Sequence, residues 1–385
     1  MSKYQNLISD NLCNLNWIRK SIKPEISQKH SKSFSVIDLF CGCGGMTLGI
    51  WEALRKNKIS IDIKLALDNN KSALMVYQKN FELDDKSISN SDINELVSCN
   101  IGGKLNTNET ILQDKYSNLD ILVAGPPCQG HSNLNNYTRR NDPRNNLYLN
   151  VIRFIEIVKP KIAIIENVST VIHDKNKVVE KSEYFLNKLG YQIESKIVNI
   201  AEFGLPQTRK RHIQVAVLNN SFKFSSLSSF KYSNRVPLSE YIKDLIDEYE
   251  SKKGIFFTPS TTKNQERIDY LFKHNLYNLP DSVRPNCHKN KTHSYKSCYG
   301  RLHWDKPAQT ITSGFGSMGQ GRYIHPLRKR VITPHEAARI QGFSDFFDFS
   351  MVILRGDLHN MIANAVPPKI TAMIVNSLIN NNTLK

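Results

Sequence analysis

Residues 34–57 read FSVIDLFCGCGGMTLGIWEALRKN, and this stretch indicates the fold. It begins with a short apolar run, passes through a glycine-rich turn and continues with the spacing of an amphipathic helix. Glycines in such a turn let a ligand approach the backbone closely; here they are Gly42, Gly44 and Gly45. The spacing is not G-x-G-x-x-G and no G-K-S/T follows, so the turn is neither a dinucleotide fingerprint nor a phosphate loop.

Short apolar runs and longer helical stretches continue to alternate as far as residue 218. We expect strands at 34–40, 63–67, 119–124, 162–165, 192–200 and 212–218, and helices at 46–57, 71–80, 147–158 and 178–189. This alternation predicts an α/β fold with a parallel, doubly wound sheet. Sheets of this kind bind ligands at the carboxyl ends of their strands.

The pattern changes at residue 219, where a stretch rich in Ser, Asn, Lys and Tyr begins. We expect a smaller, irregular domain at 219–332, after a main domain at 34–218. Regular character returns in the last segment, 333–385, where Thr333 is expected to cap a helix. Residues 1–33 form an N-terminal extension whose spacing predicts one amphipathic helix of unassigned function.

Lys and Arg exceed Asp and Glu by 52 to 35 among the 385 residues, which gives a net charge of +17. This excess favours a polyanionic partner, above all nucleic acid, although it also suits plain solubility. No apolar run approaches the roughly 18 residues of a membrane span. The first residues lack the apolar core of a signal peptide. We therefore expect a cytoplasmic protein without a membrane partner.

The seven cysteines form no regular framework, so a disulfide scaffold is not expected. One loose cluster of potential zinc ligands has a spacing that fits no established zinc pattern; it comprises Cys287, His288, His293, Cys298 and His303. We therefore expect no metal site.

Cys128 is the candidate nucleophile. It stands in GPPCQG (125–130), directly after an apolar strand. Pro126 and Pro127 fix the backbone before the sulfur, and Gly130 loosens it afterwards. A free cysteine is usually buried and inert, but one presented at a strand end is placed to meet a substrate.

Glu166 is the candidate acid, because it follows the buried strand 162–165 and should open onto the same sheet edge. A carboxyl group in an apolar site can have a raised pKa and donate a proton. Taken alone, Glu166 would also suit the cap of the next helix. A nucleophile and an acid on neighbouring strand ends favour catalysis.

Two aspartates favour an adenosine ligand without a pyrophosphate. Asp68 ends the second strand, where a carboxylate can bind both ribose hydroxyls. Asp92 follows a short third strand and is placed for an adenine amino group. The alternative is that the glycines form only a tight turn and the aspartates only cap helices.

Two further segments carry polar side chains suited to an anionic substrate. Gln207, Arg209 and Arg211 alternate onto one face of an extended chain and could clamp such a substrate, or form a solvated basic edge. The loop 129–146 is rich in Asn, Ser and Arg and follows the nucleophile directly. It suits a lid that closes on the substrate, and an ordinary surface loop is the alternative.

The chain resembles the C5-cytosine DNA methyltransferases of bacterial restriction-modification systems. Each motif alone is weak, but their common order is specific, and they cover about 34–218 and 300–375. The matching motifs are DLFxGxGG (38–45), Asp68, Asp92, GPPCQG (125–130), ENV (166–168), QxRxR (207–211), KPAQTIT (306–312), PHEAARIQGF (334–343) and ANAVPP (363–368).

The resemblance implies a Rossmann-like methyltransferase sheet that binds S-adenosyl-L-methionine. Phe40 would pack on its adenine, Asp68 would hold the ribose and Asp92 the adenine amino group. The other cofactor residues that it implies are Asp38, Gly42, Gly44, Gly45, Ile93, Pro126 and Asn364.

The resemblance also implies a covalent mechanism on double-stranded DNA. The target cytosine would be flipped out of the duplex. Cys128 would add to its C6 while Glu166 protonates N3, and C5 would then take the methyl group. Arg211 would hold the base, with Gln207 and Arg209 in support.

In such an enzyme, 219–332 would be the target-recognition domain and 333–385 would return to the catalytic domain. A monomer on DNA, protecting it from a cognate restriction endonuclease in a bacterial cytoplasm, is the expected setting. Two alternatives remain: a tRNA cytosine-C5 methyltransferase of the same family, and a catalytically silent DNA-binding protein. The chain departs from the family at His131, where Phe is common, and at Ala365, where Ser is frequent.

Overall fold

The computed structural model describes residues 15–25, 30–98, 100–127, 146–246, 260–286, 288–289 and 297–384. The chain divides into two compact units, each built from separated segments. The first unit comprises Met1–Lys23, Ile200–Arg209 and Tyr232–Ala365. The second comprises Pro24–Asn199, Lys210–Lys231 and Val366–Lys385. The domain boundaries expected from the sequence stay predictions beside these units.

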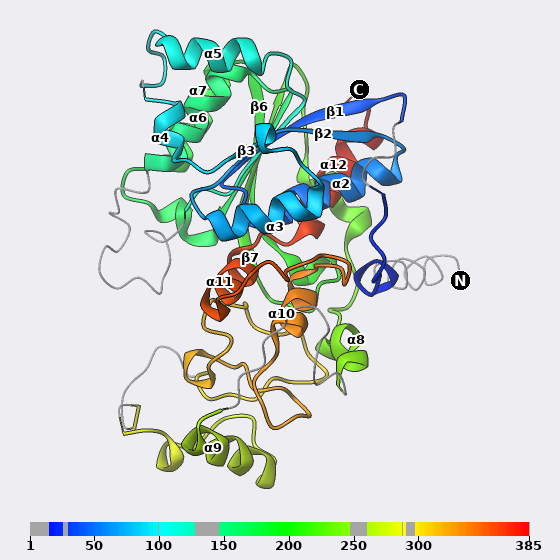
Figure 1. The fold of residues 1–385 in the computed structure, drawn as a ribbon, viewed down its shortest axis with the longest axis vertical. Coiled ribbons are helices and arrows are strands. Elements are labelled where there is room, and N and C mark those ends of the chain that lie inside the picture. Colours follow the sequence, from blue (N-terminus) through cyan, green and yellow to red (C-terminus); the bar gives the residue numbers. More distant parts are fainter. Residues whose placement is uncertain are drawn as a thin grey trace. The chain divides into compact units, whose positions relative to one another are not determined.

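The second unit is built on one mixed sheet whose strand order is β3-β2-β1-β4-β5-β7-β6 (Figure 1). Chain order reverses between β1 and β4, the switch point at which doubly wound sheets bind ligands. The predicted doubly wound α/β fold is therefore confirmed. The strands are β1 (Ser33–Leu39), β2 (Ser60–Leu67), β3 (Ile88–Ser89), β4 (Ile121–Ala124), β5 (Ile162–Val168), β6 (Tyr191–Asn199) and β7 (Lys210–Leu218).

The expectation of a wholly parallel sheet is wrong for β7. This strand runs antiparallel to both of its neighbours, β5 and β6. The physical reason lies in the connection from β6 to β7, which carries only a short 3₁₀ turn, Ile200–Phe203. A parallel strand needs a long crossover, usually a helix, whereas an antiparallel strand can follow a short connection.

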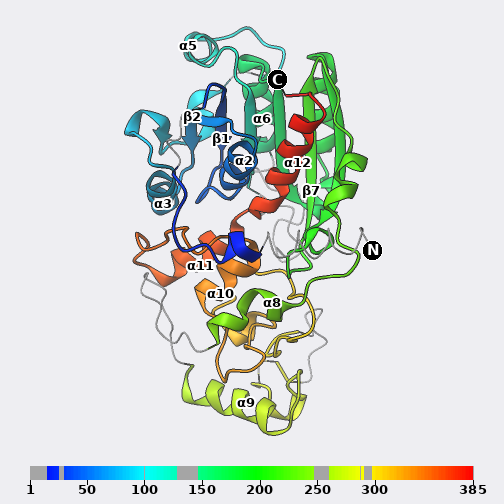
Figure 2. The same ribbon diagram turned by 90° about the vertical axis from the view of Figure 1, so that its right-hand side faces the viewer.

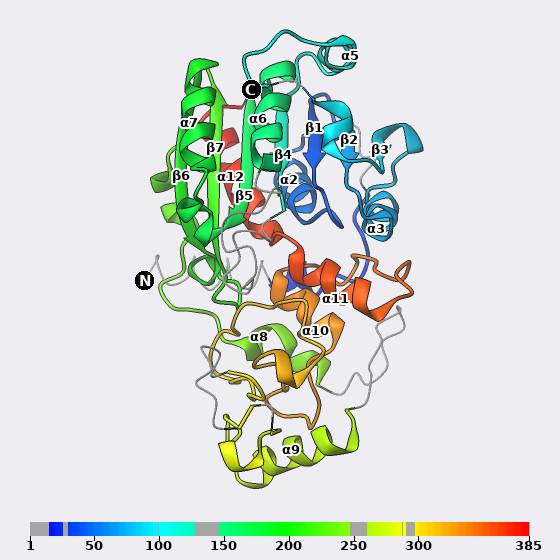
Figure 3. The same ribbon diagram turned by 90° about the vertical axis from the view of Figure 1, so that its left-hand side faces the viewer.

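Helices cover both faces of the sheet. Figures 2 and 3 show α2 and α12 on one face and α6 and α7 on the other. The predicted helices are confirmed to within a residue or two at their ends, but the short helices α4 and α5 were missed. The helices of this unit are α2 (Gly45–Lys56), α3 (Lys71–Phe81), α4 (Ile93–Leu96), α5 (Thr107–Lys115), α6 (Asn146–Val158), α7 (Val178–Lys188) and α12 (Pro368–Asn380).

Two glycines of α2 allow α12 to pack closely against it. A Cβ added to Gly49 would lie 2.0 Å from the carbonyl oxygen of Pro368, and one on Gly45 would lie 2.2 Å from that of Val366. Thr371 of α12 closes the contact by donating a hydrogen bond to the carbonyl of Met46, at 2.7 Å. Part of the glycine pattern therefore serves helix packing.

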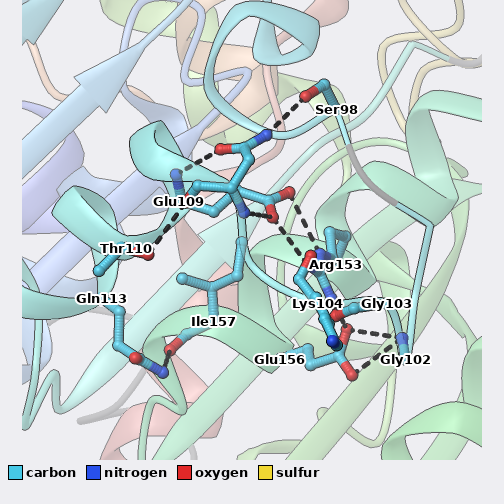
Figure 4. A network of polar contacts seen from close by, with 11 residues as sticks. Ser98, Gly102, Gly103, Lys104, Glu109, Thr110, Gln113, Arg153, Glu156 and Ile157 are labelled. Atoms are coloured by element: carbon cyan, nitrogen blue, oxygen red, sulfur yellow. Dashed lines mark hydrogen bonds and ion pairs between the residues drawn. The ribbon is translucent and has the colours of Figure 1, made fainter.

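A buried arginine fixes α5 and the preceding loop onto α6 (Figure 4). Arg153 of α6 is 2% exposed and pairs with Glu109, its Nη2 lying 2.7 Å from Oε2. Its Nη1 contacts Glu156 at 2.7 Å and donates to the carbonyl of Gly103 at 3.1 Å. Glu109 also completes a capping box with Asn106 at the start of α5. These bonds, rather than an apolar stripe, hold the polar helix α5 in place.

The first unit holds α8 (Leu238–Ile242), α9 (Thr262–Lys273), α10 (Pro334–Gln341) and α11 (Arg355–Asn364), joined by irregular chain. The capping box predicted at Thr333 and Glu336 is present at the start of α10. Arginine side chains donate hydrogen bonds to carbonyl groups of the irregular backbone. Arg301 donates to the carbonyl of Pro326 at 2.7 Å, and Arg322 donates to that of Tyr277 at 2.8 Å. They supply partners that regular structure would otherwise provide.

One stretch, Arg355–Asn380, is long and apolar enough on length and composition alone to resemble a membrane span, and 72% of its apolar window is buried within the protein. It consists of two helices, α11 with 10 residues and α12 with 13. Each is shorter than the roughly 20 residues that cross a bilayer.

Candidate functional site

The parallel ladders that join β1, β4 and β5 in the second unit end level with one another at the switch point. In the parallel ladders, Leu39 pairs with Ala124, and Ala124 pairs with Ile165. The next residue on each strand is Phe40, Gly125 or Glu166. The candidate residues Phe40 and Glu166 therefore share the carboxyl edge of the sheet with Gly125, which stands three residues before Cys128.

Gly125 lies between the other two. A Cβ built on it would lie 3.8 Å from the carbonyl oxygen of Phe40 and 3.9 Å from Oε2 of Glu166. The same Cβ would lie 3.9 Å from Cγ2 of Val366. The carboxyl group of Glu166 thus faces the strand that leads to Cys128.

Glu166 forms an ion pair with Arg211 of β7. Nε of Arg211 lies 2.7 Å from Oε1 of Glu166, and the two side chains are 13% and 10% exposed. The antiparallel direction of β7 makes this possible, because it sets Arg211 beside Val168 at the end of β5. This ion pair holds the carboxyl group of Glu166 in a fixed position at the edge of the sheet.

Cys128, His131 and the predicted loop 129–145 lie outside the described residues, and so does the side chain of Asn146. The chain that leads to Cys128 is fixed by Asn167, which is 1% exposed. Its Nδ2 donates to the carbonyl of Pro126 at 3.3 Å. The sequence reasoning did not assign this role, although the Asn stands next to the candidate acid in ENV (166–168).

The turn after β1 has an unusual backbone. Phe40, Gly42 and Gly44 have φ values of 57°, 53° and 96°, all in the left-handed region. Phe40 carries a side chain there, which costs on the order of 1–3 kcal/mol and is typical of functional sites. A Cβ on Gly42 would meet nothing within 4 Å, whereas one on Gly44 would collide with Phe81 and Tyr77. Gly42 therefore borders open space, and Gly44 is required by packing.

Asp68 ties this turn to the end of β2. One carboxylate oxygen accepts from the N–H of Gly42 and the other from that of Asn70, each at 2.8 Å. Burial raises the pKa of Asp68, and the two N–H groups oppose that effect. The half-buried carboxylate keeps lone pairs for a further donor, such as a hydroxyl group.

Asp38 lies beneath the turn, because it is 1% exposed within β1. Its Oδ2 accepts from the hydroxyl of Thr47 at 2.7 Å, and that hydroxyl also lies 2.7 Å from the hydroxyl of Tyr77. Burial is the main cause that raises the pKa of Asp38 to about 8. This residue supports the turn from inside the protein.

Asp92 follows β3, as predicted, and forms the N-cap of α4. Its Oδ1 accepts from the backbone N–H of Asn94 at 2.8 Å and from Nδ2 of the same residue at 2.7 Å. Ile93 behind it is fully buried. Asp92 also forms a capping box with Glu95, so the helix-capping alternative is realised.

Gln207, Arg209 and Asn364 belong to the first unit. Gln207 donates to Oε1 of Gln341 at 2.8 Å and accepts from the N–H of Ile311 at 2.8 Å. Arg209 donates to the carbonyl oxygens of Ala363 at 3.0 Å and Ala365 at 3.3 Å. Gln207 is thereby engaged at the end of α10 and Arg209 at the C-terminal end of α11, where Asn364 is exposed.

Comparison with known families matches residues 34–380 to the C-5 cytosine-specific DNA methylase family. The chain is 42% identical over 375 residues to the type II methyltransferase M1.BsuMI of Bacillus subtilis (strain 168), covering 96% of this chain and 86% of that protein. It is 28% identical over 364 residues to the type II methyltransferase M1.HphI of Haemophilus parahaemolyticus, covering 91% and 88%.

Solved structures share the fold. A putative DNA modification methyltransferase encoded within an E. coli prophage aligns with a TM-score of 0.61 at 22% identity, covering 90% of this chain and 99% of that one. The Dnmt2 methyltransferase of S. pombe aligns with a TM-score of 0.62 at 19% identity, covering 91% and 100%.

Proposed function

The chain belongs to the C-5 cytosine-specific DNA methylase family and is a DNA cytosine-5 methyltransferase, and on that premise we propose how its residues act. The proposed reaction transfers a methyl group from S-adenosyl-L-methionine to C5 of a cytosine flipped out of double-stranded DNA. The observation that carries the proposal is the position of Glu166, which faces Gly125 three residues before Cys128 and pairs with Arg211.

The residues at the β1–β2 edge fit an adenosine-containing cofactor. Gly42 borders open space and would leave room for the ligand, while the Asp68 carboxylate would bind the ribose hydroxyls. Phe40 would pack on the adenine, and the carboxylate of Asp92 would accept from the adenine amino group. S-adenosyl-L-methionine supplies an electrophilic methyl group at this edge.

Cytosine C5 is a weak nucleophile, so the chain must first activate the ring. The Cys128 thiolate adds to C6 and Glu166 gives a proton to N3, which together make C5 enamine-like. After C5 has taken the methyl group, N3 returns its proton to Glu166. A base then takes the C5 proton, its electron pair restores the C5–C6 double bond, and the thiolate of Cys128 leaves C6. Nucleophile and acid thus divide one difficult substitution into two easier steps.

Arg211 has two proposed tasks in this scheme. It holds Glu166 in position before the base arrives and offers its guanidinium to the base and its sugar-phosphate. Gln207 and Arg209 are proposed to support the site indirectly, because their polar groups already bond to Gln341 and to backbone at the end of α11. Asn364 and Pro126 remain proposed cofactor contacts.

The partners follow from charge and from the relatives. The net charge of +17 favours DNA, whose binding should weaken with added salt. We propose 219–332 as the target-recognition region and the loop 129–146 as the lid over the flipped base. The likeness to type II methyltransferases supports a bacterial cytoplasmic enzyme that protects DNA from a paired restriction endonuclease. We further propose that it acts as a monomer on DNA.

Bisulfite sequencing tests the proposal directly. DNA from cells that express the chain should show protected cytosines in one short motif, and cells that express Cys128→Ala should show none. Protection that persists in the variant would exclude the proposed nucleophile. If DNA is unprotected in both, methylation of tRNA from the same cells would favour the tRNA alternative, and its absence a silent DNA-binding protein.

A further inference from the structure

Residues 15–23 of the N-terminal extension belong to the first unit. Residues 15–18 form a helical turn, and the segment Met1–Lys23 clusters with that unit rather than with β1, which follows it in the chain. Leu15, Trp17 and Ile18 are 5%, 8% and 2% exposed. The family match begins only at residue 34, so this segment lies outside it.

The segment packs on the chain that follows α10. The N–H of Asp345 donates to the carbonyl of Ile18 at 2.9 Å, and that of Phe346 to the carbonyl of Lys20 at 2.8 Å. The ring of Trp17 meets that of Phe346 edge-on at 5.2 Å. Two backbone bonds and an aromatic contact of this kind fix the path of residues 344–346 against the segment.

Arg19 connects the same segment to α8 and to α10. Its Nη2 donates to the carbonyl of Glu240 at 2.7 Å, and its Nε lies 3.4 Å from Asp244. Asp244 in turn pairs with Arg339 of α10 at 2.7 Å, and Arg339 pairs with Asp345 at 2.6 Å. The ion pairs therefore form one network that includes the N-terminal segment.

This network supports the element that holds a proposed site residue. Gln341, at the end of α10, accepts from Gln207 and donates to the carbonyls of Ile362 and Ala363 in α11. A displacement of α10 would therefore disturb Gln207 and the end of α11 together. Displacements of about 1 Å far from the chemistry can reduce rates about a hundredfold.

We infer that Trp17 and Arg19 are positioning residues for DNA methylation, which hold α8, α10 and residues 344–346 in the arrangement that DNA binding requires. The inference rests on the proposed function, in which the first unit contacts DNA and the second holds the cofactor. It gives the N-terminal extension an indirect role in the recognition of DNA, through α8, α10 and residues 344–346.

The test compares Trp17→Ala and Arg19→Ala with the wild type and with Ile22→Ala, a matched control whose side chain is 78% exposed. The readouts are the Kd for S-adenosylmethionine by calorimetry, and KM for DNA and kcat. We expect KM for DNA to rise by about tenfold to a hundredfold in both variants while the cofactor Kd stays within about twofold. Trp17→Phe and Arg19→Lys should restore most of the loss.

Unchanged KM for DNA and kcat in folded Trp17→Ala and Arg19→Ala would overturn the inference. An equal loss of cofactor binding would overturn it as well, because it would indicate general damage to the fold. If Trp17→Ala does not fold, the variants Trp17→Phe, Arg19→Ala and Arg19→Lys decide the outcome. Failure of the proposed function is distinguishable, because the wild type itself would then neither methylate DNA nor bind the cofactor.

Discussion

Nε of Arg211 lies 2.7 Å from Oε1 of Glu166, across the antiparallel junction of β7 and β5. We expect Glu166→Gln to reduce kcat by about 10²–10⁴-fold, because the neutral amide cannot give a proton to the base. Cofactor binding should persist, since Glu166 lies in β5 and is not among the proposed cofactor residues. Single-turnover kinetics with a separate calorimetric Kd would measure both quantities.

Arg211→Met is the partner experiment. It leaves a buried carboxylate without its cation, so we expect lower stability and a lower kcat, with Arg211→Lys intermediate in both. A Glu166→Gln enzyme that turns over like the wild type would exclude Glu166 as the acid. An Arg211→Met enzyme with wild-type stability and kcat would exclude the ion pair as a functional element.

The nucleophile can be identified by trapping. DNA that carries 5-fluorocytosine in the methylated motif should form a stable covalent adduct, because fluorine cannot leave C5 as a proton does. We expect peptide mapping to place the adduct on Cys128 and denaturing electrophoresis to show none with Cys128→Ala. An adduct on another cysteine, such as the half-buried Cys298, would instead contradict the assigned mechanism.

The sheet edge was predictable because strand ends and glycines are local signals. Phe40 and Asp68 directly follow short apolar strands, Glu166 lies near the end of β5, and parallel strands bring such ends together. The antiparallel direction of β7 was missed because the strand pattern does not show direction. The sign in the sequence is that no helix lies between β6 and β7. Packing decided the rest: Asp38 lies in the interior because Thr47 of α2 covers it, which no strand pattern reveals.

The partners of the polar side chains in residues 207–211 were likewise not predictable from the sequence. The alternation of Gln207, Arg209 and Arg211 is visible in the sequence, but their partners are not. Arg209 bonds to backbone more than a hundred positions away in the first unit. Arg211 belongs to β7 in the second unit and pairs there with Glu166 of β5. Trp17 packs on Phe346 for similar reasons, since only tertiary contacts bring such distant positions together.

Two glycines should respond differently to the addition of one methyl group. Gly49→Ala places a Cβ about 2.0 Å from the carbonyl oxygen of Pro368, so we expect a loss of stability of about 1–3 kcal/mol or more. Gly42→Ala meets no neighbour and costs about 1–2 kcal/mol through its left-handed backbone. Gly42→Ala should nevertheless weaken cofactor binding clearly, and calorimetry beside thermal unfolding would show it. Wild-type affinity in Gly42→Ala would exclude Gly42 from the cofactor site.

The buried ion pair of Figure 4 predicts a large effect on stability. Glu109→Gln removes the charge opposite Arg153, whose side chain is 2% exposed. Breaking such a pair costs about 3–5 kcal/mol. The matched control is Glu180→Gln, which breaks the exposed pair with Lys177 and should cost less than about 1 kcal/mol. Equal effects in urea unfolding would contradict a stabilising role for the Arg153 network.

Asp38 predicts a pH dependence of stability with a definite sign. Its pKa is raised from 3.8 to about 8 by burial, so the folded state keeps a proton that the unfolded state has lost. The contribution of Asp38 is therefore fully present below about pH 4 and is lost as pH rises through about 8. The slope in that window approaches about 1.4 kcal/mol per pH unit.

Asp38→Asn isolates this contribution, because its amide oxygen still accepts from Thr47 and carries no titratable proton. We expect the variant to gain stability relative to the wild type steadily from pH 5 to pH 8, by an amount on the order of a few kcal/mol. Urea unfolding at four pH values would measure the difference. Parallel stability curves for the two proteins would contradict a protonated Asp38, and with it the idea that a neutral carboxyl group supports the glycine turn at physiological pH.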